Sequence, residues 1–369
     1  MNEKLDLAYK KAIETVNKCS TKNGLFASAG KKAYRGVWSR DSMITLITAS
    51  CTSLDSKKIQ ETFKRSLITL AKHQSKLGQI PNAVYGFNTK KLHVDFQSID
   101  SSLWFVLGEY YYKQAYGGEL FVKHKEEIKK ALTWLSYQDM EEDGLLEQLP
   151  TTDWQDAFPH RYGHTINTQA LYYQVLSFIG DKKKQKQIEV NIQNKKKRGL
   201  WNGDFYYAYR WKNHNKYKEI GEWFDSLGNL LAIVFGLADE EKSKSILNYI
   251  SDKKINEPYP VKAIYPPIDK ESKYWQDYYL DCRAGTPNEY LNGGIWTFIG
   301  GFYVMALIKV KKFKEAEEEL RKLAEANIKG NYPEWINPLT KRMYGKYQAW
   351  SAGAYIAAYE SLKAKKVLI

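Results

Sequence analysis

Apolar residues recur every three to four positions through most of the chain, and this helical period limits the possible fold more than any other feature. Strict alternation of apolar and polar residues is nearly absent. The one convincing strand signal is GDFYYAYRW at 203–211, which predicts a small hairpin outside the helical body. The period predicts twelve helices, near 3–19, 41–53, 56–77, 99–115, 119–138, 164–179, 182–193, 224–237, 239–250, 292–309, 312–328 and 348–364.

These helices alternate in character along the chain. The odd-numbered ones are rich in Lys and Glu, as in KKFKEAEEELRKLAEANIKG, and the even ones carry small and apolar residues, as in NGGIWTFIGGFYVMALI. An amphipathic helix buries one face, whereas an apolar helix is buried on several, so we expect an outer ring around an inner ring. Six helical hairpins closed in this way form an all-α (α/α)6 barrel. A stacked solenoid is the competing fold, but no repeat of fixed period is visible.

Length and composition predict a single large core. The chain has 369 residues, 43% hydrophobic and 27% charged, and no linker rich in Pro, Gly or Ser divides it, which favours one domain over 1–369. Its cysteines, Cys19, Cys51 and Cys282, are too far apart in sequence to indicate a disulfide framework or a metal pair. The N-terminus has the pattern of an amphipathic helix rather than a signal peptide, and no apolar run reaches the ~18 residues of a membrane span. We therefore expect a cytoplasmic protein without a membrane partner.

The formal net charge of +14 raises the possibility of nucleic-acid binding. Much of the excess lies in DKKKQKQIEVNIQNKKKRG at 181–199. This run has no aromatic residue for base stacking, and Ile188 and Ile192 form an apolar stripe, as in a helix with one solvated face. We expect no nucleic-acid partner, and a homo-oligomer stays possible.

Six unusual stretches stand at the starts of the even helices: YRGVWSRD, FQSID, DWQDAFPHRYGH, GEWFDS, NEYLNGG and PEWINPLTKRMYGKYQAW. Each combines Asp, Glu, Asn or Arg with aromatic or apolar residues. If the even helices run in one direction inside a ring, all these stretches meet at one mouth. Sugars offer apolar C–H faces and a rim of hydroxyls, so such a mouth indicates a saccharide site. Hydrolysis of a glycosidic bond needs two carboxyl groups, and the candidates are Asp41, Asp100, Asp153, Asp156, Asp225, Glu289 and Glu334.

Seven stretches between Trp38 and Tyr355 carry a resemblance to known families: WSRDSMITLIT, SIDSSLWF, WQDAFPHRYGHTINTQALYY, LWNGDFYYAY, FDSLGNLLAIVFGLA, YLNGGIWTFIGGFYVMAL and PEWINPLTKRMYGKYQAWSAGAY. In this order they resemble successive motifs of (α/α)6-barrel glycoside hydrolases. Two groups are most similar, the alkaline/neutral invertases and the amylo-α-1,6-glucosidase domain of glycogen debranching enzymes. One departure is that Ala157 and Phe158 replace a pair of arginines typical of the invertases.

The resemblance implies roles for individual residues. Asp156 in WQDA matches the general acid, and Glu334 in PEWINP matches the general base of an inverting reaction. Arg40 and Asp41 resemble the pair that grips sugar hydroxyls in related glucosidases. The other expected substrate contacts are Trp38, Asp100, Trp104, Trp154, Gln169, Asn292, Trp296, Gln348 and Trp350.

Several of these residues have structural alternatives. Asp41 and Asp100 stand where helix N-caps are expected, and Trp104, Trp296 and Trp350 could be core residues. Asp153 is favoured as a supporting group rather than as the acid. Trp154 and Phe158 are expected to desolvate Asp156 and raise its pKa. His160 and His164 have no HExxH context, so we expect neither a metal site nor a cofactor.

The favoured function is an inverting glycoside hydrolase that cleaves a terminal α-glucosidic bond in a small, sucrose-like saccharide. One alternative is a debranching-type α-glucosidase acting on short α-glucans. Two alternatives of other classes are a non-catalytic saccharide-binding barrel and a basic scaffold that binds through a solenoid surface. The presence of both Asp156 and Glu334 favours the enzyme.

Overall fold

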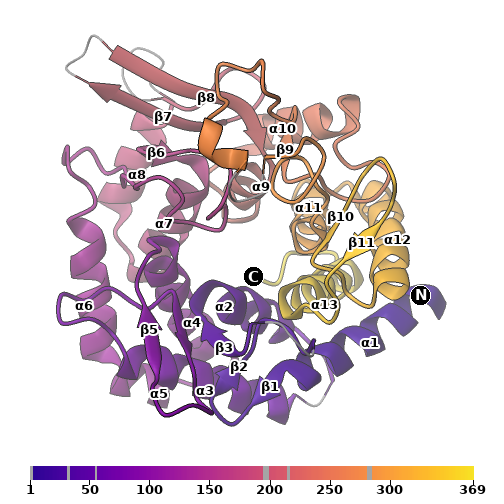
Figure 1. The fold of residues 1–369 in the computed structure, drawn as a ribbon. Helices are drawn as coiled ribbons and strands as arrows, with labels where there is room; N and C mark the ends of the chain where they lie inside the picture. Colours follow the sequence, from indigo (N-terminus) through magenta and orange to yellow (C-terminus); the bar gives the residue numbers. More distant parts are fainter. Residues whose placement is uncertain (1–2, 31–33, 55, 194–198, 214–216, 281–284) are drawn as a thin grey trace.

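The computed structural model describes residues 3–30, 34–54, 56–193, 199–213, 217–280 and 285–369. Among these, helices that are apolar nearly all round form a ring in which each helix contacts the next and the last contacts the first (Figure 1). Their side chains are mostly buried, as expected for helices with no polar face. In ring order they are α2 (Ser39–Ala49), α4 (Asp100–Tyr116), α7 (Ile166–Ile179), α9 (Ser226–Val234), α11 (Thr297–Lys309) and α13 (Ala349–Ala364).

Amphipathic helices lie outside this ring and bury one face each. In α3, for example, the buried positions Ile59, Phe63, Leu67 and Leu70 recur at the helical period. The helix predicted over 119–138 is instead two helices, because the chain leaves helical geometry at His124, whose Nδ1 lies 2.6 Å from a carboxylate oxygen on α4. The outer helices are α1 (Glu3–Cys19), α3 (Lys57–Lys72), α5 (Glu119–Lys123), α6 (Lys125–Ser136), α8 (Lys182–Asn191), α10 (Glu240–Asp252) and α12 (Phe313–Gly330).

The expectation of an all-α chain needs correction, since short antiparallel strands decorate the loops between helices. The hairpin predicted at 203–211 is part of a four-stranded sheet, β6 (His164–Thr165), β7 (Tyr207–Asn213), β8 (Tyr217–Asp225) and β9 (Ile264–Tyr265). Here β8 takes the first residues of the helix predicted over 224–237. A second sheet joins β3 (Gly36–Trp38), β4 (Ala83–Tyr85) and β5 (His93–Asp95), and two-residue strands form the pairs β1 (Ser20–Thr21) with β2 (Gly24–Leu25) and β10 (Trp335–Ile336) with β11 (Met343–Tyr344). Segments this short carry no readable sequence period.

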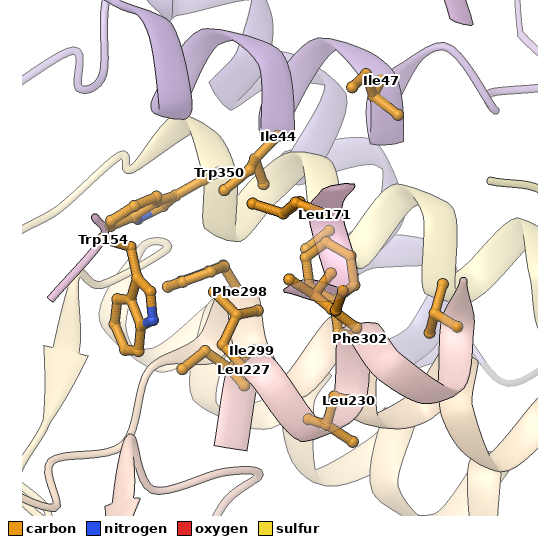
Figure 2. Close-up of a cluster of buried hydrophobic side chains, with 14 of the residues drawn as sticks. Ile44, Ile47, Trp154, Leu171, Leu227, Leu230, Phe298, Ile299, Phe302 and Trp350 are labelled. Atoms are coloured by element: carbon orange, nitrogen blue, oxygen red, sulfur yellow. The ribbon is translucent and has the colours of Figure 1, made fainter. Parts of the chain in front are cut away.

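The core fills the inside of the ring. Figure 2 shows Ile44 of α2, Leu171 of α7 and Phe298 of α11 in one buried cluster, with Trp154 and Trp350 at its edge. Close packing of α11 on α13 depends on a glycine, because a Cβ at Gly301 would lie 2.7 Å from the Cβ of Ala354. The two tryptophans end the core at one mouth of the ring, and the functional residues gather above them.

Three sequence expectations concern the chain as a whole. In the part that the structure describes, no helix combines the length and apolar character that crossing a membrane requires. Cys19 and Cys51 are free thiols, while Cys282 lies outside the described residues. The basic run at 181–199 begins as α8, with Ile188 buried, and its residues 194–198 also lie outside the described ranges.

Candidate active site

A narrow pocket of about 120 Å³ lies at the N-terminal ends of α2, α11 and α13. All of its residues except Trp296 come from four of the six unusual stretches identified in the sequence. They combine carboxyl groups, one guanidinium, an amide and aromatic rings: Tyr34, Trp38, Arg40, Asp41, Trp154, Asp156, Tyr290, Trp296, Glu334, Gln348 and Trp350. These four stretches were therefore correctly predicted to meet at one mouth.

Asp156 reaches the pocket from the loop between α6 and α7. Its side chain is 49% exposed, but the protein crowds the carboxyl on several sides, and this desolvation raises its pKa. The Nη1 atom of Arg40, 3.8 Å away, partly offsets that shift. Arg40 itself is held from behind, since its Nε and Nη2 donate to Asp100 at 2.7 and 3.1 Å and Nη2 also donates to Ser98 at 3.0 Å.

Glu334 enters the pocket immediately before β10. Its backbone N–H donates to the carbonyl of Tyr344 at 2.8 Å, and the ring of that tyrosine stacks on Trp335 with centroids 4.0 Å apart. Gly345 lies directly against it, because a Cβ on that glycine would be 2.7 Å from the Cβ of Glu334. Burial raises the pKa of Glu334 to about 7; the charges of neighbouring carboxylates add to the shift, and a hydrogen bond with Tyr34 opposes it.

Asp41 is the third carboxyl group in the pocket, in the first turn of α2. Burial raises its pKa to about 7, with Arg40 lowering it and Asp156 adding to the rise. Three carboxyl groups this close cannot all ionise cheaply, so near neutrality the pocket retains protons as well as carrying negative charge. That is the condition under which one carboxyl can donate a proton while another accepts one.

Aromatic side chains form the floor of the pocket. Trp154 meets Trp296 edge to face at 5.8 Å between ring centroids, and Trp296 meets Trp350 in the same way at 5.7 Å. Phe298 stacks on Trp350 at 4.3 Å and continues into the core (Figure 2). Such surfaces suit the apolar face of a sugar ring and keep bulk water from the carboxyl groups.

Four of the expected substrate contacts lie outside the pocket. Trp104 is a core residue of α4, and Asp100 contacts Arg40 beneath the pocket. The amide of Gln169 bonds both the N–H and the carbonyl of Leu146, at 3.0 and 2.7 Å. Asn292 likewise ties backbone segments together through Ile268 and Gly285. These amides cross-link loops, a role that residue type alone does not distinguish from binding.

Asp153 is fully buried beside the pocket, not in it. Burial alone would raise its pKa, but the charge and hydrogen bond of Arg161, 2.7 Å away, and a bond from Gln148 bring it below the usual range. Arg161 also donates to Asp225, which caps α9. Phe158 was expected beside Asp156, yet it packs on Tyr279 with centroids 4.5 Å apart, so only Trp154 of the two lines the pocket.

Two pocket residues were not selected from the sequence, Tyr34 and Tyr290. Both stand in stretches that had been singled out, YRGVWSRD and NEYLNGG, so the signal was their membership of those stretches. Burial and the nearby carboxylates, Glu334 first, raise the pKa of Tyr34 to about 12, and a hydrogen bond with Tyr290 moderates the rise. The same causes raise the pKa of Tyr290. Both hydroxyls therefore stay protonated and available as donors.

No group of three or more His, Cys, Asp or Glu side chains within the described ranges is arranged to hold a metal ion. The two histidines of the loop that carries Asp156 have other contacts. Nδ1 of His160 lies 2.6 Å from the hydroxyl of Tyr278, and Nε2 of His164 lies 3.5 Å from a carboxylate oxygen of Glu147.

Comparison with solved structures defines the class of fold. GH63 mannosylglycerate hydrolase from Thermus thermophilus in complex with glucose superposes with a TM-score of 0.69 over 94% of this chain and 98% of its own, at 13% identity. A glycosidase variant in complex with glucose gives 0.69 over 99% and 100%, at 12% identity. The chain therefore has the fold of helical glycoside hydrolases along nearly its whole length.

Sequence comparison narrows the relationship. Residues 218–365 match the family model described as alkaline and neutral invertase. Neutral/alkaline invertase 1, mitochondrial, of Oryza sativa subsp. japonica is 30% identical over 141 residues, which are 37% of this chain and 22% of that protein. Alkaline/neutral invertase E, chloroplastic, of Arabidopsis thaliana is 33% identical over 142 residues, with the same shares. The matches thus span about a fifth of these relatives' length.

The predicted resemblance to the alkaline/neutral invertases is confirmed over this C-terminal part. The matched stretch contains Tyr290 and Glu334, whereas Asp41 and Asp156 precede it. The resemblance to debranching glucosidases stays a prediction.

Proposed function

We propose that this protein is an inverting glycoside hydrolase that removes a terminal sugar at an α-glucosidic bond of a small saccharide, and that its ring of helices is an (α/α)6 barrel. The observation that carries the proposal is the meeting of Asp156 and Glu334 in one narrow pocket with an aromatic floor. The two residues are 178 positions apart in sequence (334 − 156) and lie on different loops. A purely structural role would not require either carboxyl to face such a pocket.

In the proposed reaction Asp156 is the general acid. It donates its proton to the glycosidic oxygen as the bond from that oxygen to the anomeric carbon breaks. Glu334 accepts a proton from water while the water oxygen bonds to the anomeric carbon from the opposite face, so the configuration inverts. This geometry calls for carboxyl groups roughly 6.5–9.5 Å apart. Burial raises the pKa of both groups, to about 7 for Glu334, and a raised pKa helps a carboxyl to hold the proton that it must donate.

The other pocket residues would bind the terminal sugar. Arg40 and Asp41 offer a charged donor and acceptor for its hydroxyls, and Trp38 and Gln348 add a ring and an amide. The tryptophans of the pocket floor supply the apolar surface. A pocket of about 120 Å³ closed by this floor favours entry of a chain end over random cleavage within a polymer. The proposed chemistry uses no metal and no cofactor.

Sucrose is the first candidate substrate, because the C-terminal part of the chain, which contains Glu334, matches the invertase family model. The place of action stays a prediction, since the relatives carry mitochondrial, chloroplastic and cytosolic names. Short α-glucans, the substrates of the debranching-type alternative, belong in the same test.

The test is to incubate the purified protein with sucrose, maltose, isomaltose, trehalose and panose and to measure the released sugars by chromatography. Proton NMR of the first products would identify the anomer formed. We expect release from at least one compound with inversion, and none from the Glu334→Gln variant. A folded protein that binds these sugars and releases nothing would instead support the non-catalytic saccharide-binding barrel.

A further inference from the structure

A groove of about 430 Å³ lies on the outer side of the ring, along the outer helix α6 (Figure 1). It shares no residue with the carboxylate pocket. Tyr110 of α4 and Phe121 of α5 form one part of it. The remaining lining residues belong to α6 and recur at steps of three and one, so they occupy a single face of that helix: Lys125, Ile128, Lys129, Leu132, Thr133 and Ser136. The groove therefore follows α6 from end to end.

The groove has an aromatic and apolar floor. The ring of Tyr110 meets Phe121 edge to face at 4.8 Å between centroids and stacks on Phe178 of α7 at 5.1 Å. Leu132 lines the groove and is only partly buried. Apolar surface continues beyond Phe121, because the next residue, Val122, is 70% exposed. Contiguous apolar surface that solvent reaches marks sites where proteins bind one another.

Two lysines, Lys125 and Lys129, are the only charged residues among the described residues that line the groove. Both side chains are exposed, and neither ammonium group makes an ion pair in the part of the chain that the structure describes. Their neighbour Lys123 differs, because its Nζ lies 2.9 Å from a carboxylate oxygen of Glu119. Lys125 and Lys129 are one helical turn apart, so their like charges repel each other. Carboxylates of a partner would relieve this repulsion and complement both charges.

The length and shape of the groove suit a helix as its occupant. The twelve residues of α6 extend over about 17 Å, at ~1.5 Å per residue. A helix of about three turns laid along α6 would place apolar residues at i, i+3, i+4 and i+7 on the floor and acidic residues beside the lysines. A second copy of this chain does not fit, because two-fold pairing through this groove would set lysines against lysines. The formal net charge of +14 opposes such self-association as well.

We propose that this groove is a docking site for another protein, which binds there through an acidic amphipathic helix. The apolar face of that helix packs on Tyr110, Phe121 and Leu132, and its carboxylates pair with Lys125 and Lys129. The proposal goes beyond the hydrolase function and does not depend on it. The carboxylate pocket lies at the N-terminal ends of α2, α11 and α13, so a helix seated along α6 covers none of the residues that line it. Docking is therefore a means of recruitment rather than of inhibition.

The test measures the binding of a fluorescein-labelled helical peptide of about 18 residues to the full chain by fluorescence anisotropy. The peptide carries Leu at i, i+3, i+4 and i+7 and Glu at the flanking positions. Two further peptides probe specificity, one with the same residues in scrambled order and one with Lys in place of Glu. The protein variants are Lys125→Glu, Lys129→Glu and Leu132→Ala. The matched control is Lys130→Glu, the same substitution at the exposed residue next to Lys129, which does not line the groove.

We expect the Kd of the acidic peptide to rise about fivefold or more in each of the three variants and to stay within about twofold in the control. The lysine and scrambled peptides should bind the wild type at least about tenfold more weakly than the acidic one does. Thermal unfolding verifies that every variant is folded. No binding of the acidic peptide, equal binding of the scrambled one, or an equal loss in Lys130→Glu would overturn the inference.

Two other occupants of the groove have their own readouts. A dimer that forms as the protein is concentrated and that Leu132→Ala abolishes, seen by light scattering, would identify a second copy of this chain. Vesicles of phosphatidylcholine and phosphatidylserine that retain the wild type but not Lys129→Glu, with no binding of the acidic peptide, would identify an anionic membrane surface. Either result would overturn the inference of a helical protein partner. None of these measurements uses hydrolytic activity, so their outcome is independent of the proposed function.

Discussion

Arg40 and Asp100 form a buried, two-point ion pair, in which Nε and Nη2 of the guanidinium donate to the carboxylate at 2.7 and 3.1 Å. Their side chains are 4% and 0% exposed. The planar guanidinium is thereby fixed, and its remaining nitrogen, Nη1, faces Asp156 across 3.8 Å. The positive charge of Arg40 is thus held beside the proposed acid, and its position is fixed by Asp100 rather than by Asp156.

The first prediction concerns Arg40→Lys. A lysine keeps the charge but lacks the planar fork, so it cannot pair with Asp100 at two points and still face Asp156. Arg40 lowers the pKa of Asp156, and its loss from that position should move the alkaline limb of kcat/KM to higher pH and reduce kcat. The pH–rate profile measures both effects, with the surface substitution Arg321→Lys as control. A lower rate with an unmoved alkaline limb would contradict this coupling.

The second prediction is that Asp156→Asn and Glu334→Gln each lose about 10²–10⁴-fold in kcat, the usual contribution of a positioned acid or base. Both variants should fold, because each changes a carboxyl that faces a pocket. Glu289→Gln is the matched control, since Glu289 lies on a neighbouring loop and lines a different cavity. If Asp156→Asn kept full activity, the acid would have to be another carboxyl, and Asp41 would be the next to test.

The third prediction concerns stability and pH. The folded protein raises the pKa of Asp41 and Glu334 to about 7, above the ~4 of an unfolded carboxyl, so between these values it holds protons that the unfolded chain releases. Stability from these groups must therefore fall as pH rises from about 4 to about 7. Glu334→Gln and Asp41→Asn should raise Tm at a pH of about 8 and have little effect at about 4.5. Equal shifts of Tm at both pH values would show that burial does not raise the pKa of these two carboxyl groups.

Much of the fold was predictable because helical period and the alternation of apolar and charged helices are properties of long segments. The error at 119–138 has a local cause, since His124 breaks the helix while its ring contacts Glu109, a partner 15 positions away. The short strands escaped prediction for a related reason. A pairing such as Trp335 with Tyr344 is decided by tertiary contacts around two residues, not by a pattern.

The site was predictable as a set of stretches but not residue by residue. Asp100 and Asp156 are the same residue type, and both stand in stretches that were singled out from the sequence. Only the fold shows that Asp100 is buried against Arg40 while Asp156 faces the pocket. Gln169 and Asn292 were expected to bind substrate because amides suit sugars, yet their bonds go to backbone groups. Tyr34 and Tyr290 stand in stretches that had been singled out, but they were missed because tyrosine is common in this chain, with 28 in all, and residue type alone does not separate a pocket tyrosine from a core one.

The fourth prediction compares two glycines that both have a left-handed backbone conformation. Gly345 has φ +66°, and a Cβ there would meet the Cβ of Glu334 at 2.7 Å, whereas Gly180, with φ +77°, has nothing within 4 Å of such a Cβ. Both Gly→Ala changes should cost roughly 1 kcal/mol of stability through the left-handed conformation. Only Gly345→Ala should also displace Glu334 and lower kcat, by at least about tenfold. Comparable kcat values in the two variants would mean that Gly345 does not position the carboxyl.

The fifth prediction separates Asp153 from its neighbour Asp156. Asp153 and Asp225 share the fully buried guanidinium of Arg161, so Asp153→Ala leaves that charge with one partner. Removing a partner from a buried pair costs about 3–5 kcal/mol, and the remaining bond to Asp225 places the expected loss at the lower end, about 3 kcal/mol. Denaturant unfolding measures this loss, and Glu317→Ala, which breaks an exposed pair with Arg321, should lose less than about 1 kcal/mol.

Well below its Tm, Asp153→Ala should keep kcat within about tenfold of the wild type, because Asp153 lies outside the carboxylate pocket. A stable but inactive Asp153 variant would reverse these roles and make Asp153 the group on which catalysis depends.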